Sequence, residues 1–60
     1  MIKFVGYNNQ GYVTVSIRGN KYVYLTDAAW IPQIWKKAKY TPGAALNDLK
    51  KWGKLIEKPI

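Results

Sequence analysis

Residues 12–25, YVTVSIRGNKYVYL, decide the fold of this chain. From residue 12 to residue 18 the side chains alternate between apolar and polar, which is the period of a half-buried β-strand. Val13, Val15 and Ile17 therefore share one side of a predicted strand. The second run, from residue 21 to residue 25, is rich in tyrosine and β-branched residues and predicts the strand that follows.

The turn between these two strands is predicted at Gly19 and Asn20. Both residue types tolerate a positive φ, which a two-residue hairpin turn requires at its two central positions. Arg18 should then lie opposite Lys21. In this register the apolar sides of the two strands coincide, so one face of the hairpin is suited to a core.

Working outward, a first strand over residues 2–7 is expected to return through Asn8-Asn9-Gln10-Gly11, four turn-forming residues. Tyr7 should then lie opposite Tyr12. The prediction is a three-stranded antiparallel meander with strands at 2–7, 12–18 and 21–25. Its mixed outer face should hold Lys3, Val5, Tyr7, Tyr12, Thr14, Ser16, Arg18, Lys21, Val23 and Leu25.

The second half of the chain predicts two helices, at 31–39 and 42–52. Residues 27–30 form a lead-in turn, because Pro32 is tolerated only near the start of a helix. Thr41 is expected to cap the second helix and Gly53 to end it, with a loose tail at 57–60. The sequence thus predicts a single α+β domain with both short helices on one face of the sheet.

Composition argues against catalysis. The chain has 60 residues with ten Lys and Arg, three acidic residues, no His and no Cys, for a formal charge of +7. The usual general base, thiol nucleophile and soft metal ligands are therefore missing. Asp27, Asp48 and Glu57 are too far apart in sequence to indicate an acid–base pair. We expect no enzyme, no cofactor and no metal site.

The same composition predicts a soluble cytoplasmic protein. The chain has no apolar run near the ~20 residues of a membrane span. Its first residues lack the apolar segment of a signal peptide. The absence of cysteine also fits a reducing compartment.

The stretch from about Tyr7 to Leu49 resembles the KTSC domain, a short unit of small bacterial and phage proteins. The similar positions are Val15 and Ile17, Gly19 at the turn, Tyr22 and Tyr24 as Y-x-Y, and Thr41, Gly43, Leu46 and Asn47 in place of S-x-G-x-x-aromatic-Asn. The chain departs from this pattern at Leu46, which replaces an aromatic residue, and at Pro32, which lies after the family's Val-Pro position. The resemblance implies strands followed by helices and no particular activity.

The basic residues of the helical half are the first candidate site. They form two clusters, Lys36, Lys37 and Lys39, then Lys50, Lys51, Lys54 and Lys58. Side chains with this spacing can follow a phosphate backbone. The alternative is a solvated surface that keeps a small protein soluble. The near absence of acidic residues in these stretches favours binding.

The outer sheet face is the second candidate site. Tyr7 and Tyr12 beside Lys3, Arg18 and Lys21 suit the stacking of unpaired bases, with the cations holding phosphates. Cross-strand packing of the two tyrosines is the alternative, and the one we expect. An uncovered apolar strip on this face also allows a homodimer. Trp52, near the end of the second helix, is either a core residue, as we expect, or an exposed stacking anchor.

Two functions remain open. The first is a non-enzymatic module that binds DNA or RNA through these basic and aromatic residues. The second is a protein-interaction module, such as a phage or mobile-element factor, that binds an acidic host protein. Both use complementary charge, so salt sensitivity alone does not separate them.

Overall fold

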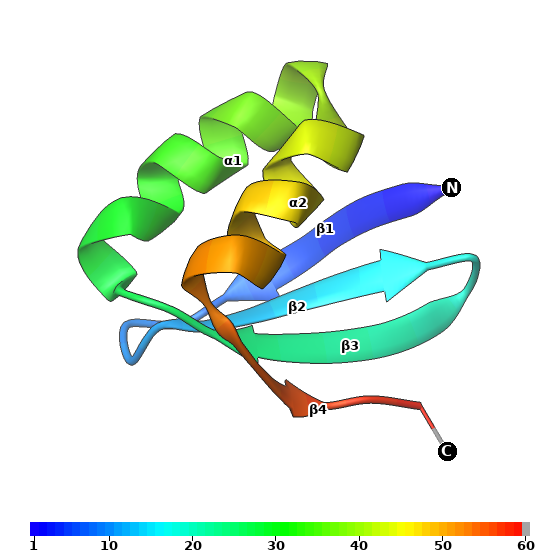
Figure 1. Cartoon of the computed structure of the whole chain (residues 1–60), viewed down its shortest axis with the longest axis horizontal. Coiled ribbons are helices and arrows are strands. Elements are labelled where there is room, and N and C mark those ends of the chain that lie inside the picture. The colour runs from blue at the N-terminus through cyan, green and yellow to red at the C-terminus, as the bar shows by residue number, and fades with distance from the viewer. Residues whose placement is uncertain (60) are drawn as a thin grey trace.

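A computed structural model describes residues 1–59 and shows four strands and two α-helices (Figure 1). The helices follow the first three strands, as predicted, and a short 3₁₀ turn, η1, leads into them. In chain order the elements are β1 (Ile2–Tyr7), β2 (Tyr12–Ile17), β3 (Asn20–Leu25), η1 (Ala28–Trp30), α1 (Ile31–Tyr40), α2 (Pro42–Trp52) and β4 (Lys54–Glu57).

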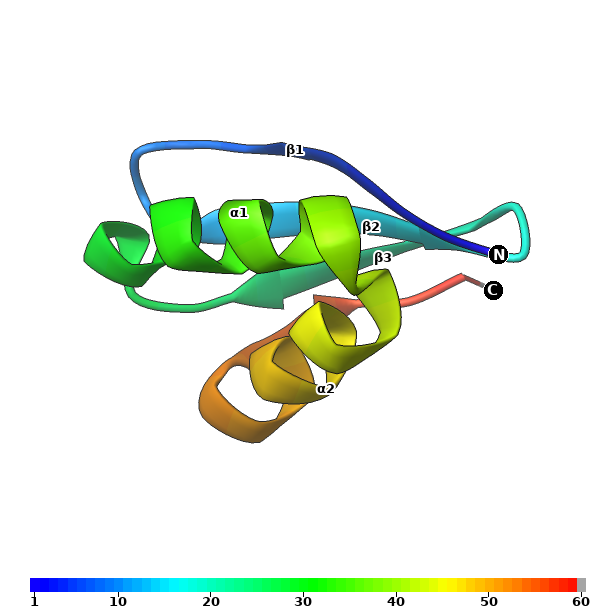
Figure 2. The same cartoon turned by 90° about the horizontal axis from the view of Figure 1, so that it is seen from above.

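The sheet has the order β1-β2-β3-β4, and all neighbouring strands are antiparallel. The predicted α+β class and three-stranded meander are confirmed, and β4 is an addition at the edge beside β3. Both helices lie against one face of the sheet and leave the other uncovered (Figure 2). The N-terminus and the β2–β3 turn lie at the same end of the molecule.

The core lies between the covered face of the sheet and the two helices. Alternate residues of β2 and β3 supply its sheet side, and the predicted apolar positions of α1 and α2 supply its helix side. The buried residues are Val13, Val15, Tyr24, Ile31, Ile34, Ala45, Leu46 and Leu49. Residues 1–59 include no buried charged side chain, so the core of this small domain rests on apolar burial.

The β2–β3 turn lies one position earlier than the sequence predicts. Its central residues are Arg18 and Gly19, with φ of 53° and 82°, and Ile17 pairs with Asn20. The predicted pairing of Arg18 with Lys21 is therefore wrong by two residues, an even shift that leaves the paired side chains of β2 and β3 on their predicted faces but moves Arg18 into the turn. The observed register pairs all six residues of each strand, at the cost of a positive φ for Arg18.

A β-bulge in β1 moves Tyr7 to the covered face. Phe4 pairs with Val15, but Gly6 pairs with Thr14, so Val5 is an extra residue in the strand. Tyr7 consequently lies opposite Val13 rather than Tyr12. The predicted position of Tyr7 on the outer face is wrong, because a regular alternation of faces cannot anticipate an inserted residue.

The bulge in β1 allows two of its aromatic residues to contact the ring of Trp35. Phe4 and Tyr7 both meet this ring edge-on, with centroid separations of 5.4 Å and 4.7 Å. Such edge-to-face contacts stabilise a packed pair beyond the area it buries. The bulge thus brings two residues of β1 onto one tryptophan of α1.

The helices begin and end close to the predicted positions. The Asp27 side chain accepts a hydrogen bond of 3.0 Å from the Ala29 N–H and so caps η1. Thr41 occupies the N-cap position of α2, but its hydroxyl donates to the Lys37 carbonyl at 3.2 Å. Thr41 therefore closes α1 instead of capping α2, because the Tyr40–Pro42 link joins the two helices directly.

The C-terminal segment corrects the predicted tail. Lys54–Glu57 forms β4 and pairs with β3, so Glu57 belongs to the sheet, and the predicted tail continues into Ile60, which lies outside the described residues. Gly53 allows this strand to begin. A Cβ at Gly53 would lie 2.7 Å from the Leu49 carbonyl oxygen and 3.1 Å from that of Leu25. Only glycine lets the chain pass between α2 and β3.

Candidate functional site

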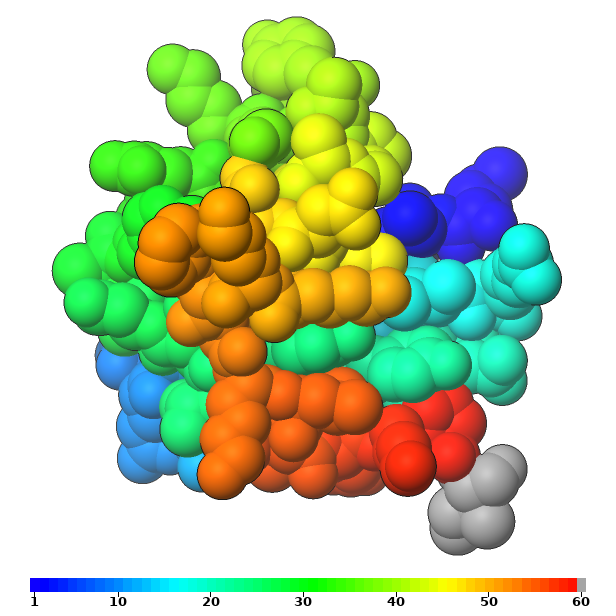
Figure 3. Space-filling model, viewed as in Figure 1, coloured from blue at the N-terminus to red at the C-terminus, as the bar shows by residue number. Residues whose placement is uncertain are grey.

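The helical surface carries half of the basic residues, three in α1 and two in α2. These two helices form most of the face seen in Figure 3, with β4 along its lower edge. Lys36, Lys39, Lys50 and Lys51 are exposed. Lys39 borders a hollow between α1 and β1, whereas Lys50 lines a groove beside α2.

Lys37 differs from the other basic residues of the helical surface. Its ammonium group lies 2.5 Å from a carboxylate oxygen of Asp48, in an ion pair that joins α1 to α2. Within residues 1–59 this is the one ion pair between side chains, so nine of the ten basic side chains have no carboxylate partner there. Lys37 thus has a structural partner, while the others remain available to an external anion.

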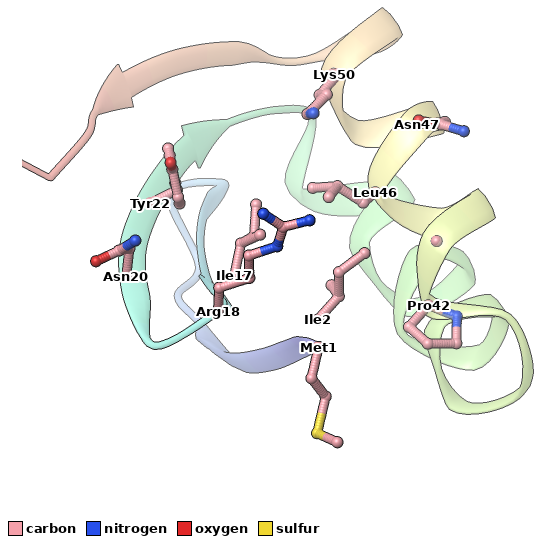
Figure 4. A pocket seen from close by; sticks show the side chains of 11 residues that line it. Met1, Ile2, Ile17, Arg18, Asn20, Tyr22, Pro42, Leu46, Asn47 and Lys50 are labelled. Carbon is pink, nitrogen blue, oxygen red and sulfur yellow. The ribbon is translucent and has the colours of Figure 1, made fainter.

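A groove runs between the β2–β3 turn and α2, with a volume of about 900 Å³ (Figure 4). Its floor is apolar and its rim is basic and polar. The lining residues are Met1, Ile2, Ile17, Arg18, Asn20, Tyr22, Pro42, Gly43, Leu46, Asn47 and Lys50.

Two cations face each other across this groove. Figure 4 shows the Arg18 side chain extending from the turn toward α2, where Leu46 and Lys50 form the opposite side. Among the described residues that line the groove none is acidic. Two positive groups on an apolar concave surface raise the local potential, because the low-dielectric wall screens them less than water does. The groove is suited to a ligand that combines an anion with an apolar or aromatic body.

The uncovered sheet face holds only part of its predicted patch. The register places Lys3, Ser16 and Lys21 in one row across the strands. A second row holds Tyr12, Leu25 and Lys54. Lys54 is thereby separated from the helical cluster in which the sequence placed it. Tyr7 contacts Trp35 on the other face and, at the edge of the sheet, also borders a hollow with Tyr12 and Lys21. Arg18 lines the groove and is separate from this patch.

Trp52 lies on the surface, with 65% of its side chain exposed, so the expected core position is wrong. Gly53 turns the chain into β4 directly after it, which leaves the ring outside the core. The Lys51 ammonium lies 5.1 Å from the centre of the ring, within the range of a cation–π contact. Trp52 and Trp30 also line a hollow beside Asp27.

Tyr24 is the group with a perturbed acidity near the core. Burial raises the pKa of its phenol, and the neighbouring Tyr22 raises the pKa further. The phenol is therefore neutral at physiological pH, which suits a packing residue and indicates no acid–base chemistry. Residues 1–59 also contain no cluster of three or more His, Cys, Asp or Glu side chains that could hold a metal ion.

The floor of the groove could not be identified from the sequence. Ile2, Ile17 and Leu46 lie at apolar positions of regular elements, where a core role is the normal expectation. Ile2 and Ile17 are partly buried and Leu46 is buried, so all three contact the core and also border the groove. The one signal for the groove was the position of the β2–β3 turn, which gives Arg18 its positive φ. From the sequence this turn was predicted one residue too late, so that signal was missed.

Comparison with protein-family models, curated proteins and solved structures finds no match to this chain. The resemblance to the KTSC domain therefore stays a prediction. Within the described part of the chain, neither helix has the length and hydrophobicity to cross a membrane.

Proposed function

We propose that this protein is a small non-enzymatic module that binds nucleic acid through the basic surface of its helices and the adjoining groove. The observation that carries the proposal is the excess of unpaired cations, nine basic side chains without a carboxylate partner in residues 1–59. An ordinary mixed surface intersperses both signs of charge. A polyanion is the partner that compensates such an excess.

The residues proposed to hold phosphates are those on the helical side and at the groove. They are Arg18, Lys36, Lys39, Lys50 and Lys51. Each contact with a phosphate releases a condensed counterion, so affinity falls as salt rises. Five such contacts correspond to a slope of log affinity against log salt of about −3.5 for a single strand, at about −0.7 per phosphate.

An acidic protein is the second candidate partner, and the uncovered sheet face favours it. Val5 is 58% exposed there, beside partly exposed Val23 and Leu25. An open sheet with apolar side chains is a common docking surface for another chain or a second copy. Under this second proposal, the protein is a KTSC-like phage or mobile-element factor that binds an acidic host protein. Both versions of the proposal include a cytoplasmic location.

The test is fluorescence anisotropy of labelled single-stranded DNA, single-stranded RNA and duplex DNA, titrated with the protein at several salt concentrations. We expect micromolar or tighter binding that weakens along the slope given above. Absence of binding to all three polymers at moderate salt would overturn the proposal.

A pair of charge-reversal variants locates the surface. Lys50→Glu with Lys51→Glu removes two helical cations, and Lys3→Glu with Lys21→Glu makes the same change in net charge on the uncovered sheet face. We expect the first pair to weaken binding more than the second. If either pair abolishes binding to an acidic protein and leaves nucleic-acid affinity unchanged, the second candidate function is supported instead.

A further inference from the structure

We propose that the groove between the β2–β3 turn and α2 binds one unpaired nucleotide of a single strand, with its phosphate at Arg18 and Lys50 and its base on the apolar floor. This inference rests on the proposed function and specifies its ligand. The groove's volume of about 900 Å³ lies within the ~300–1,000 Å³ typical of sites that enclose small ligands.

The phosphate position follows from the two cations. Arg18 extends from the turn toward α2, and Lys50 comes from the facing side, so an anion in the groove meets a positive group from each side (Figure 4). The guanidinium group offers several N–H donors in one plane, which suits a phosphate better than a point charge does. No described carboxylate lines the groove to compete for either group.

The base position follows from the floor. The partly buried side chains of Ile2, Ile17 and Tyr22 present an apolar and aromatic surface, and buried Leu46 borders it. The face of a nucleobase is apolar and stacks on such surfaces, whereas its polar edges stay toward the opening. The arrangement therefore matches a base and its phosphate together.

A duplex does not fit this arrangement. Its base faces are stacked inside the helix, and its grooves offer polar edges to a protein. A duplex can reach the cations of the rim but leaves the apolar floor unused. The groove therefore distinguishes a single strand from a duplex, which the charges alone do not.

The experiment compares three labelled probes of equal phosphate number, an oligothymidylate, an abasic strand and a duplex, by anisotropy at one salt concentration. We expect the wild-type protein to bind the oligothymidylate about tenfold tighter than the abasic strand, a factor within the range that stacking of one base provides. The duplex should bind like the abasic strand.

Two groove variants and one control variant test whether the groove causes the preference for oligothymidylate over the abasic strand. Arg18→Asn removes the guanidinium and keeps a residue that tolerates positive φ, so the turn is preserved. Tyr22→Leu removes the ring and keeps an apolar side chain. Tyr22→Leu should abolish the preference for thymidine over the abasic strand. Lys36→Gln, on the exposed side of α1, makes the same change in charge as Arg18→Asn and should weaken all three probes equally.

For Arg18→Asn we expect about a tenfold loss of single-strand affinity, the scale of a lost hydrogen bond to a charged group, against a smaller loss for Lys36→Gln. Equal binding of the three probes by the wild-type protein would overturn the groove proposal and leave the proposed function standing. Binding of none of them would overturn both. Displacement of the oligothymidylate by a Glu-Leu repeat peptide, as effectively as by unlabelled oligothymidylate, would also overturn it and make a protein segment the occupant.

Discussion

Single residues with a positive φ set the geometry of both hairpins. Gly11 has φ of 94° and its carbonyl accepts a hydrogen bond from the Thr26 N–H at 2.9 Å. Gly19 has φ of 82° and open space where a Cβ would lie, whereas a Cβ at Gly11 would collide with the Thr26 carbonyl. The two glycines share the conformational requirement and differ in their surroundings.

This difference gives a matched pair of variants. Gly19→Ala should lower the free energy of unfolding by about 1–2 kcal/mol, the cost of a left-handed alanine. Gly11→Ala adds a backbone collision to the same cost, so we expect a loss of more than about 2 kcal/mol. Urea denaturation followed by tryptophan fluorescence measures both values. Equal losses for the two variants would contradict the close packing of the first hairpin against Thr26.

Tyr24 gives a pH dependence at the same scale. Because burial raises the pKa of its phenol in the folded chain, the unfolded chain releases this proton first as the pH rises past about 10. The contribution of Tyr24 to stability is complete below that pKa and is lost as the pH rises through the folded value. The free energy of unfolding should therefore be lower at about pH 11 than at about pH 8.

Two tyrosine variants isolate this effect. Tyr24→Phe cannot ionise and should make the alkaline fall smaller, while Tyr40→Phe, at a position that is 75% exposed, should leave it unchanged. Urea denaturation at the two pH values gives the comparison. An identical fall in the wild-type protein and in Tyr24→Phe would assign the pH dependence to other groups.

At the scale of elements, periodicity in the sequence was enough for the order and approximate ends of β1 to β3, α1 and α2, because each of these elements buries one face. Periodicity was insufficient to predict which residues of neighbouring strands pair with each other. The choice between two turn positions depends on how completely β2 and β3 pair, and the bulge depends on the packing of β1 against Trp35. The short strand β4 has four exposed residues, so no pattern of burial marks it in the sequence.

The bulge makes a deletion in β1 tolerable. Without Val5, Gly6 still pairs with Thr14 and Tyr7 with Val13, so both sides of the strand keep their register. We expect deletion of Val5 to change the free energy of unfolding by less than about 1 kcal/mol, as for other surface changes. Circular dichroism during thermal unfolding measures the effect.

The matched deletion is Thr14 in β2. This strand pairs on both sides, so a one-residue deletion turns Val13 from the core to the uncovered face and should prevent folding. A deletion of Val5 as damaging as the deletion of Thr14 would mean that β1 pairs without a bulge.

At the scale of the whole molecule, the fold gives the protein a helical side and an uncovered sheet side, and basic residues lie on both. Composition predicted the excess of positive charge, and the pattern of the sequence predicted the two helices that carry half of it. It did not predict that Lys37 is paired with Asp48, that Lys54 faces away from the helices, or that Arg18 and Lys50 share a groove. These relations depend on register and on side-chain direction, which only the assembled sheet and helices define.

The central claim is that the helical side and its groove bind single-stranded nucleic acid. The most direct measurement is a ¹H–¹⁵N NMR titration of the protein with an oligothymidylate. We predict the largest shift changes at Arg18, Tyr22 and Lys50 and along α2, with little change in the Lys3, Ser16 and Lys21 row. Changes concentrated in that row, with the groove unaffected, would contradict the account and assign binding to the uncovered face of the sheet.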